Sequence, residues 1–207
     1  MFIVIEGIDG AGCETQAKAV SRALTDRSGQ PTVSLIKYPH YDDAVGKMIQ
    51  QFLYQNKSLT AKEQFLLYSL QFINDIPKIN RYTAANAHPP TNSYLVADRY
   101  FTSTICYQTL EGIPEEIALR FADDFGIIKP DLVFYLDVDP DTALSWKYGE
   151  DKRLNFRETD LAFMKKTYNQ YDRLVKRQVW TKWVRINGKQ TKENVTREIL
   201  NKINQPQ

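Results

Sequence analysis

The chain has 207 residues, of which 43% are hydrophobic and 25% charged, with a formal net charge of +2. This length and composition predict one globular domain, residues 1–207, with a core of its own. The nearly balanced charge argues against binding of nucleic acid or a membrane, and no apolar run reaches the ~20 residues that span a bilayer. Cys13 and Cys106 form neither a disulfide framework nor a metal-ligand spacing. We therefore expect a cytoplasmic protein, without room for a signal peptide before the apolar run at Phe2.

Short apolar runs, separated by helical segments, are predicted to form the strands of one sheet. These runs are residues 2–5, 32–37, 94–97, 132–138 and 183–186. Strands that alternate with helices indicate an α/β fold, with a parallel sheet of about five strands and helices on both faces. Ligands of such sheets bind beyond the carboxyl ends of the strands.

Segments with helical spacing of apolar residues occupy most of the remaining chain. The predicted helices are residues 14–24, 42–54, 61–82, a segment from about 102, a segment from 140, 158–178 and 191–203. Residues 86–92 are predicted to be a loop. Residues 147–157 are polar and charged, and Gly149 is a candidate hinge within them.

The first strand runs into a glycine-rich turn, and a helix follows that turn at once. Gly7, Gly10 and Gly12 supply the glycines. Strand, glycine loop and helix in this order let backbone N–H groups and a helix N-terminus face a polyphosphate. A plain turn without a ligand is the alternative, which the position between an apolar strand and an amphipathic helix disfavours. The sequence therefore predicts a phosphate-binding loop.

This loop departs from the usual pattern G-x-x-x-x-G-K-[ST] at two positions. Cys13 stands in place of the lysine, and Glu14 in place of the first hydroxyl residue. A cation that stabilises the transferred phosphoryl group is worth ~3–4 kcal/mol, so we expect lower turnover, which Cys13→Lys should raise. Glu14 is tolerable if it faces Mg²⁺, and Thr15 supplies a hydroxyl one position late. A thiol at a helix N-terminus is also expected to have a lowered pKa.

A second group of polar residues follows the predicted strand 94–97. Asp98 and Arg99 by themselves would be typical of an ion pair at a strand end. Ser103 and Tyr107, however, are predicted to lie one helical turn apart and to face the ends of the strands. The guanidinium of Arg99 can form a fork onto a phosphate.

Together these segments resemble the thymidylate kinase family of nucleoside-monophosphate kinases. The matching segments are residues 5–12 with Thr15 and Gln16, residues 98–108, residues 129–138, and residues 186–188 with the helix after them. The resemblance covers nearly the whole chain and implies a P-loop NTPase-type fold. It also implies Mg²⁺-dependent phosphoryl transfer from ATP to a nucleoside monophosphate, dTMP above all, by a homodimer packed through helices.

The resemblance also implies which residues bind and react. ATP would be bound by Gly7, Ile8, Asp9, Gly10, Ala11, Gly12, Cys13, Glu14 and Thr15. The metal would be held by Glu14, Thr15 and Asp98. The catalytic residues would be Asp9, Asp98, Arg99, Arg153 and Arg157, the last two from a lid at about 147–157 that closes over ATP. The acceptor would meet Asp9, Tyr38, Pro39, Tyr68, Phe72, Arg99, Ser103, Tyr107 and Gln108. Tyr68 would stack on the base, and Tyr107 would exclude a ribose 2′-hydroxyl.

Two further positions depart from the family pattern. Tyr41 and Phe72 stand where the family carries arginines around the acceptor. Because Phe72 cannot donate a hydrogen bond to a base, we expect a weakened preference for dTMP over other pyrimidine monophosphates, unless Gln71, Asn74 or Gln108 reads the base.

The altered positions leave two other functions open. One is a kinase-like nucleotide-binding protein with weakened catalysis, which intact Asp9, Asp98 and Arg99 disfavour. The other is a P-loop hydrolase of ATP alone, for which the sequence lacks a water-orienting residue after a second Asp-rich strand. Trp180 and Trp183 are interpreted as part of a strand edge, and His40 and His88 are too isolated to predict a metal site.

Overall fold

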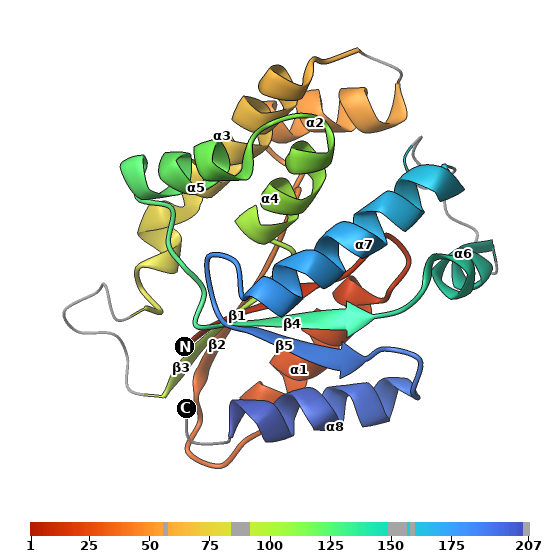
Figure 1. The fold of residues 1–207 in the computed structure, drawn as a ribbon. Coiled ribbons are helices and arrows are strands. Elements are labelled where there is room, and N and C mark those ends of the chain that lie inside the picture. The colour runs from red at the N-terminus through yellow and green to blue at the C-terminus, as the bar shows by residue number, and fades with distance from the viewer. Residues whose placement is uncertain (56–57, 84–91, 149–156, 158–159, 205–207) are drawn as a thin grey trace.

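The protein is described by a computed structural model covering residues 1–55, 58–83, 92–148, 157 and 160–204. Within these residues all the predicted strands form one parallel sheet, in the order β2-β3-β1-β4-β5 (Figure 1). The strands are β1 (Phe2–Glu6), β2 (Thr32–Lys37), β3 (Ser93–Asp98), β4 (Leu132–Asp137) and β5 (Trp183–Asn187). The predicted α/β fold is therefore confirmed.

The central strand is the most apolar part of the sheet. Residues 2–5 are 0% exposed, because both faces of β1 are covered by helices. The edge strand β2 has a mixed burial pattern and pairs with β3 alone. The fully apolar strand thus lies at the centre and a mixed strand at the edge, as expected for a parallel sheet with helices on both faces.

Helices cover both faces of the sheet (Figure 1). They are α1 (Cys13–Thr25), α2 (Ala44–Tyr54), α3 (Ala61–Ile79), α4 (Phe101–Leu110), α5 (Glu115–Asp124), α6 (Pro140–Tyr148), α7 (Leu161–Arg177) and α8 (Lys192–Ile203). Helices α1 and α8 pack together on one face, whereas α4 lies between α3, α5 and α7 on the other. The glycine loop at residues 7–12 thus leads directly into α1, which packs on the lower face of the sheet in this view.

The structure corrects some helix bounds. Helix α5 was not predicted as a separate helix, and the signal for it is Gly112, with φ of 99°, followed by Pro114 and two acidic residues. These residues end one helix and begin the next. Helix α3 is shorter than the predicted 61–82 and ends at Ile79, and α7 begins at Leu161 rather than at residue 158. Most of the predicted loop 86–92 lies outside the described residues.

Helix α3 has a well-defined start. The Thr60 side chain accepts from the Glu63 backbone N–H at 3.3 Å, and the Glu63 carboxylate accepts from the Thr60 N–H at 2.7 Å. This capping box satisfies two backbone donors that the helix itself leaves without partners. It fixes the start of the helix that carries Tyr68 and Phe72.

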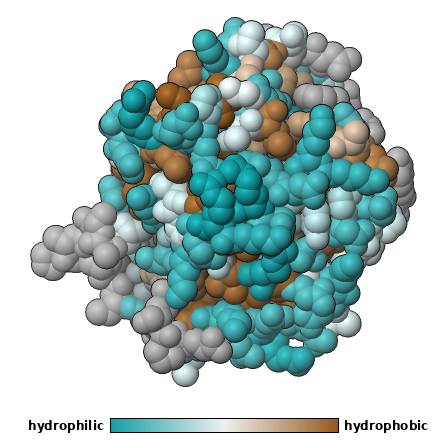
Figure 2. All heavy atoms as spheres, in the orientation of Figure 1, coloured by the Kyte–Doolittle hydropathy of each residue, from teal (hydrophilic) through white to brown (hydrophobic). Residues whose placement is uncertain are grey.

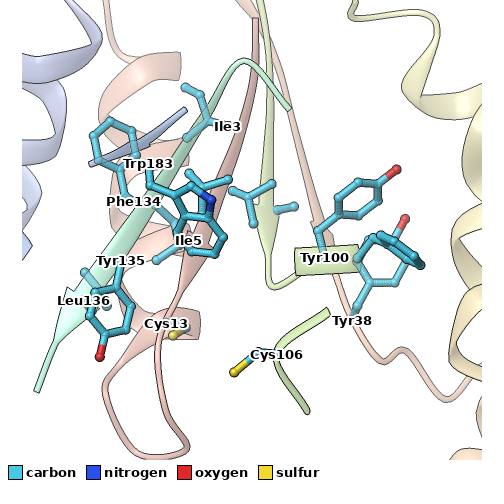
Figure 3. Packing of buried hydrophobic residues seen from close by; sticks show 14 of the residues in the cluster. Ile3, Ile5, Cys13, Tyr38, Tyr100, Cys106, Phe134, Tyr135, Leu136 and Trp183 are labelled. Carbon is cyan, nitrogen blue, oxygen red and sulfur yellow. The ribbon is translucent and has the colours of Figure 1, made fainter. Parts of the chain in front are cut away.

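One continuous core joins the sheet to both helical layers (Figure 3). Cys13 and Cys106 belong to it and are both free thiols. Hydrophilic side chains cover most of the face seen in Figure 2, with apolar side chains in smaller patches between them. Among the described residues, no helix is both long and apolar enough to cross a membrane.

Candidate functional site

The predicted site residues meet at the carboxyl ends of β1, β2 and β3. In the parallel register Asp98 of β3 pairs with Ile5 of β1 and with Lys37 of β2. A cavity of about 600 Å³ opens beyond this edge. The predicted residues that line it are Ile8, Asp9, Gly10, Gly12, Cys13, Glu14, Thr15, Tyr38, Pro39, Tyr68, Phe72, Asp98, Arg99, Ser103, Tyr107, Gln108 and Arg157. Two regions predicted from separate motifs thus share one cavity.

The glycine loop has the geometry of an anion cradle. Gly10 and Gly12 have φ of 88° and 91°, a region that side-chain-bearing residues rarely adopt. A Cβ on Gly7 would lie 2.9 Å from the Cβ of Ala11, so Gly7 and Ala11 pack closely beneath the loop. The N-cap residue of α1 is Gly12, which has no side chain to cap the helix, so it leaves the first N–H groups available to a ligand. These features fit a bound polyphosphate.

The structure contradicts the expected acidity of Cys13. Its side chain is only 6% exposed, and burial raises the pKa of the thiol well above its ordinary value. The positive charge of Arg99 opposes this shift but is outweighed by the loss of hydration. Cys13 is therefore a neutral thiol in the core beneath the loop (Figure 3).

Glu14 is neutralised by two lysines. Lys18 Nζ lies 2.6 Å from its Oε1, and Lys37 Nζ lies 2.6 Å from its Oε2. Hydrogen bonds from these two ammonium groups lower the pKa of Glu14 to about 2. The carboxylate is ionised at neutral pH, and its charge is balanced locally. Thr15, one position later, is exposed at the cavity.

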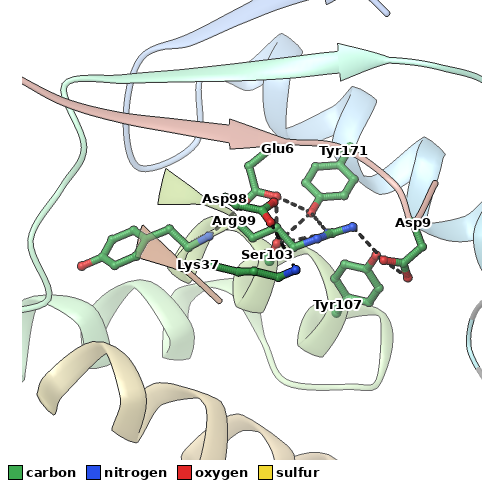
Figure 4. A network of polar contacts seen from close by, with 9 residues as sticks. Glu6, Asp9, Lys37, Asp98, Arg99, Ser103, Tyr107 and Tyr171 are labelled. Carbon is green, nitrogen blue, oxygen red and sulfur yellow. Dashed lines mark hydrogen bonds and ion pairs between the residues drawn. The ribbon is translucent and has the colours of Figure 1, made fainter. Parts of the chain in front are cut away.

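Asp9 of the loop contacts the second motif directly. Arg99 Nη2 donates to Asp9 Oδ1 at 2.7 Å, and the Tyr107 hydroxyl donates to Asp9 Oδ2 at 3.2 Å. Arg99 Nη1 also lies 3.4 Å from Ser103 Oγ (Figure 4). The backbone φ of Arg99 is 63°, a strained value for this residue type. The contacts hold the guanidinium at the cavity in a fixed orientation.

The sequence did not identify Glu6 as part of this network. Glu6 is 0% exposed and accepts from the Tyr100 backbone N–H at 3.2 Å, Thr102 Oγ1 at 2.6 Å and Ser103 Oγ at 2.8 Å. The Tyr171 hydroxyl is a fourth donor to this carboxylate. A carboxylate directly between an apolar strand and Gly7 is the signal that could have revealed it. Its hydrogen bonds fix the turn that presents Arg99.

Asp98 is a buried carboxylate at the edge of the cavity. It is 5% exposed, and burial raises its pKa to about 6. Lys37 Nζ, 3.9 Å from Asp98 Oδ2, partly opposes this shift. The described residues include no cluster of three or more His, Cys, Asp or Glu side chains that could hold a metal. A Mg²⁺ ion here would take most of its ligands from phosphates and water, with one or two carboxylates, which suits this ion.

Aromatic side chains form one wall of the cavity. The Phe72 ring centroid lies 4.7 Å from that of Tyr38 and 5.0 Å from that of Tyr100. Phe72 is 2% exposed, so it mainly fills space where the family carries an arginine. The Tyr38 hydroxyl donates to Asp75 at 2.6 Å. Tyr68 is half-buried and faces the cavity from α3.

One end of the cavity carries a polar cluster. Gln108 Nε2 donates to Gln64 Oε1 and to Glu111 Oε2, each at 3.3 Å. Arg157 Nη2 donates to the same two residues, and its guanidinium lies 5.4 Å from the Tyr107 ring centroid. The described hydrogen bonds of Arg157 go to Gln64 on α3 and to Glu111, which follows α4. Its closure over ATP stays a prediction. Arg153 and most of the predicted lid lie outside the described residues.

The remaining sequence interpretations concern residues away from the cavity. Trp183 is 5% exposed at the start of the edge strand β5, and the Trp180 ring lies 5.4 Å from that of Phe101. Trp183 is therefore part of the core, and Trp180 is partly buried against it. His40 lies 4.0 Å from carboxylates of Asp43 and Asp75, and His88 lies outside the described residues.

A model of the thymidylate kinase family matches residues 5–199, a range that contains both motifs and the whole cavity edge. The chain belongs to the thymidylate kinase family. A thymidylate kinase of Leptospira borgpetersenii is 31% identical over 202 residues, covering 97% of this chain and 91% of the relative. A probable thymidylate kinase of Methanococcus maripaludis is 35% identical over 179 residues, covering 84% and 77%. A thymidylate kinase of Caenorhabditis elegans is 28% identical over 160 residues, covering 73% and 70%.

Membership of the thymidylate kinase family establishes the reaction class. The protein is a nucleoside-monophosphate kinase, a phosphotransferase acting on nucleotides, as the sequence predicted. The P-loop and ATP as donor are the family's expected features, and the cradle formed by residues 7–12 agrees with them.

Proposed function

We propose that this kinase transfers the γ-phosphoryl group of MgATP to dTMP, giving dTDP and ADP. The main support is the contact between Asp9 of the glycine loop and Arg99 of the second motif. Arg99 Nη2 lies 2.7 Å from Asp9 Oδ1, and both residues line the same cavity. Donor and acceptor phosphates must lie next to each other for direct transfer. A contact between the two phosphate-facing groups supports that arrangement.

The donor side would use the backbone more than side chains. The first N–H groups of α1 and the glycine loop would hold the ATP phosphates. Asp98, with Thr15 or Glu14 nearby, would orient the hydrated Mg²⁺. When bound, the metal neutralises charge on the phosphate oxygens. The protein's own contribution is alignment of the reacting groups.

The acceptor side would begin at Arg99, which would hold the dTMP phosphate in a bidentate contact. Tyr68 would stack on the base, and Tyr107 would exclude a ribose 2′-hydroxyl. Tyr38, Pro39 and Phe72 would form the apolar wall.

A catalytically weakened nucleotide-binding protein remains the second candidate. Cys13 and Glu14 favour it, because a loop without its usual cation gives less stabilisation to the transferred group. The ordered positions of Asp9, Asp98 and Arg99 favour the kinase.

The deciding experiment is a coupled assay of ADP release with dTMP, dUMP, dCMP and UMP as acceptors, with Mg²⁺ and with excess EDTA. We expect Mg²⁺-dependent turnover with dTMP. Calorimetric binding of ATP without acceptor-dependent ADP release would establish the binding protein instead. ADP release that does not need an acceptor would indicate a hydrolase.

We also propose a single-domain protomer, residues 1–207, with a lid at about 147–157, that forms a homodimer in the cytoplasm. Leu66 and Leu70 lie one turn apart on α3 and are 57% and 41% exposed, and Met48 on the adjoining α2 is 43% exposed. These apolar side chains would suit a helix-to-helix interface. Light scattering of the parent and of Leu66→Glu tests it, because a monomeric parent would contradict the proposal.

A further inference from the structure

The missing loop cation raises the question of which other group meets the donor phosphates. Among the described residues, the basic side chains that line the cavity are Lys18, Lys37, Arg99 and Arg157. Arg99 is held by Asp9, and Arg157 lies against Glu111 in the polar cluster. The two lysines are the candidates on the donor side.

Lys37 is fixed in position by the sheet. It is the last residue of β2, and the parallel register pairs it with Asp98. Its Nζ lies 2.6 Å from Glu14 Oε2 in the first turn of α1. It also lies 3.9 Å from Asp98 Oδ2, and Figure 4 shows Lys37 and Asp98 together. The ammonium group therefore lies between the start of the phosphate-facing helix and the carboxylate expected at the metal.

Lys18 differs from Lys37 in the element that carries it. It contacts the same carboxylate at the same 2.6 Å, but it lies one turn further along α1 and is 63% exposed. Lys37 is 50% exposed, and its Nζ also approaches Asp98. Variants of Lys18 and Lys37 therefore remove the same charge from two different positions, and comparing them isolates the effect of position.

We propose that Lys37 supplies the cation for the terminal phosphates of ATP that residue 13 lacks. In the free protein Glu14 holds the ammonium group at the end of β2. With MgATP bound, Glu14 and Asp98 would lie beside the metal, and Lys37 would turn from Glu14 to the β- and γ-phosphate oxygens. The inference rests on the proposed function for the identity of the donor, and it deepens that function by naming the residue that contacts the transferred group.

The electrostatics favour this exchange. Glu14 and Asp98 present two carboxylates at the donor end, which would repel a triphosphate if they had no cationic partners. A lysine has a compact charge on a flexible stem, so it can move from a carboxylate to a nearby phosphate without backbone rearrangement. A purely structural role, in which Lys37 only neutralises Glu14, makes different predictions for the variants below.

The first experiment compares Lys37→Met with Lys18→Met by calorimetry, using Mg²⁺ with AMP-PNP and Mg²⁺ with ADP. We expect Lys37→Met to weaken AMP-PNP binding about tenfold, the loss of one charge-assisted contact, and to change ADP binding much less. Lys18→Met should stay within about threefold for both nucleotides, as for an exposed ion pair. Equal effects of the two variants, or no loss of AMP-PNP affinity in Lys37→Met, would overturn the proposal.

The second experiment separates phosphate contact from neutralisation of Glu14. If Lys37 only neutralises Glu14, then the Glu14→Gln change should restore AMP-PNP affinity in Lys37→Met. If Lys37 contacts phosphate, the double variant should remain weak, whereas Cys13→Lys should restore affinity in Lys37→Met and act much less in the parent. Such non-additivity is the signature of two groups that serve one contact.

Turnover provides an independent readout. With dTMP as acceptor, kcat should fall about 100-fold in Lys37→Met, and Lys37→Arg should retain most of it. A parent without dTMP-dependent turnover would overturn the proposed function, while the AMP-PNP comparison would still test Lys37. Thermal melting of each variant shows whether it is folded. If Lys37→Met melts like the parent and keeps the parent's AMP-PNP affinity and kcat, the proposal is refuted.

Discussion

The Tyr171 hydroxyl donates to Glu6 Oε2 at 2.7 Å, although the two residues are 165 positions apart in the chain. Glu6 ends the central strand, and Tyr171 lies on α7, which follows the segment 147–157. The same hydroxyl lies 3.1 Å from Ser103 Oγ and 3.5 Å from Arg99 Nη1. A buried acid and a phenol therefore fix the turn that carries Arg99 at the cavity.

Tyr171→Phe should loosen Arg99 without removing it. We expect a loss of about 1–2 kcal/mol in the free energy of unfolding, because Glu6 loses one of its buried donors. The KM for the acceptor should rise while ATP affinity stays unchanged. Urea unfolding and acceptor titrations measure the two effects. Tyr168→Phe is the control, since Tyr168 lies on the same helix but its hydroxyl donates to Asp137 of β4 at 2.8 Å. An equal change in KM there would contradict the role of Tyr171.

Arg99→Ala should impair the acceptor site selectively. A bidentate phosphate contact both binds and orients, so we expect a higher acceptor KM and a kcat lower by about 100-fold. Arg99→Lys, which keeps the charge but loses the fork, should lie between the alanine variant and the parent. Steady-state kinetics with each substrate varied in turn checks this. Weaker ATP binding with an unchanged acceptor KM would reverse our assignment of the two pockets.

Base selectivity should be weaker than the family pattern implies, because Phe72 offers no hydrogen bond. Gln71 Nε2 is already used by the His40 carbonyl at 2.7 Å, and Asn74 is exposed outside the cavity lining. Of these three amides, Gln108 is the one that lines the cavity, where its Nε2 also donates to Gln64 and Glu111. We expect similar kcat/KM for dTMP and dUMP, lower values for UMP, and altered pyrimidine preference in Gln108→Leu. An exclusive preference for dTMP that survives Gln108→Leu would show that another group reads the base.

Cys13 should react slowly with alkylating reagents. Burial raises the pKa of the thiol, so little thiolate exists at pH 8, and the sulfur is shielded from solvent. Cys106 is buried in the same way. Iodoacetamide labelling followed by mass spectrometry should show slow modification of both thiols in the folded protein and rapid modification in urea. Fast labelling of Cys13 that ATP blocks would instead show an open, acidic thiol.

The stability of the metal-free protein should reflect Asp98. Its pKa is raised from 3.8 to about 6, so its favourable contribution is complete below pH 3.8 and is lost as the pH rises through 6. Asp98→Asn removes the cost of the buried charge, and its stabilising effect should be greater at pH 8 than at pH 4 by on the order of 2 kcal/mol.

Urea unfolding in EDTA at the two pH values measures this difference. Asp139→Asn is a control of opposite sign, because hydrogen bonds from Thr142 and Lys189 lower the pKa of Asp139. That variant should lose stability at pH 8. An Asp98→Asn effect that does not change with pH would contradict the burial argument.

The sequence predicted the fold and placed the glycine loop and the motif at Asp98 and Arg99 at the ends of strands, which in a parallel sheet share one edge. It did not predict the direct contact between Asp9 and Arg99, which the structure shows. It did not predict Glu6, whose position in an apolar strand suggests only burial, or Tyr171, whose contact depends on how α7 packs. The expected acidity of Cys13 was wrong because the helix N-terminus is a local feature, whereas burial depends on the complete fold. For Lys37 the sequence predicted only the end of a strand, because nothing in the neighbouring residues reveals that it pairs with Asp98.

That register has a consequence for comparing relatives. Because β3 lies between β1 and β2, the position paired with Asp98 can be found in any aligned family member, even where the loop motif is unrecognisable. If one cation is enough, the two positions should covary. Members that have lost the loop lysine should keep Lys or Arg at the position of Lys37, and members with the loop lysine should vary there. The positive charge that is missing from the loop motif would then be supplied from β2, on the other side of β3.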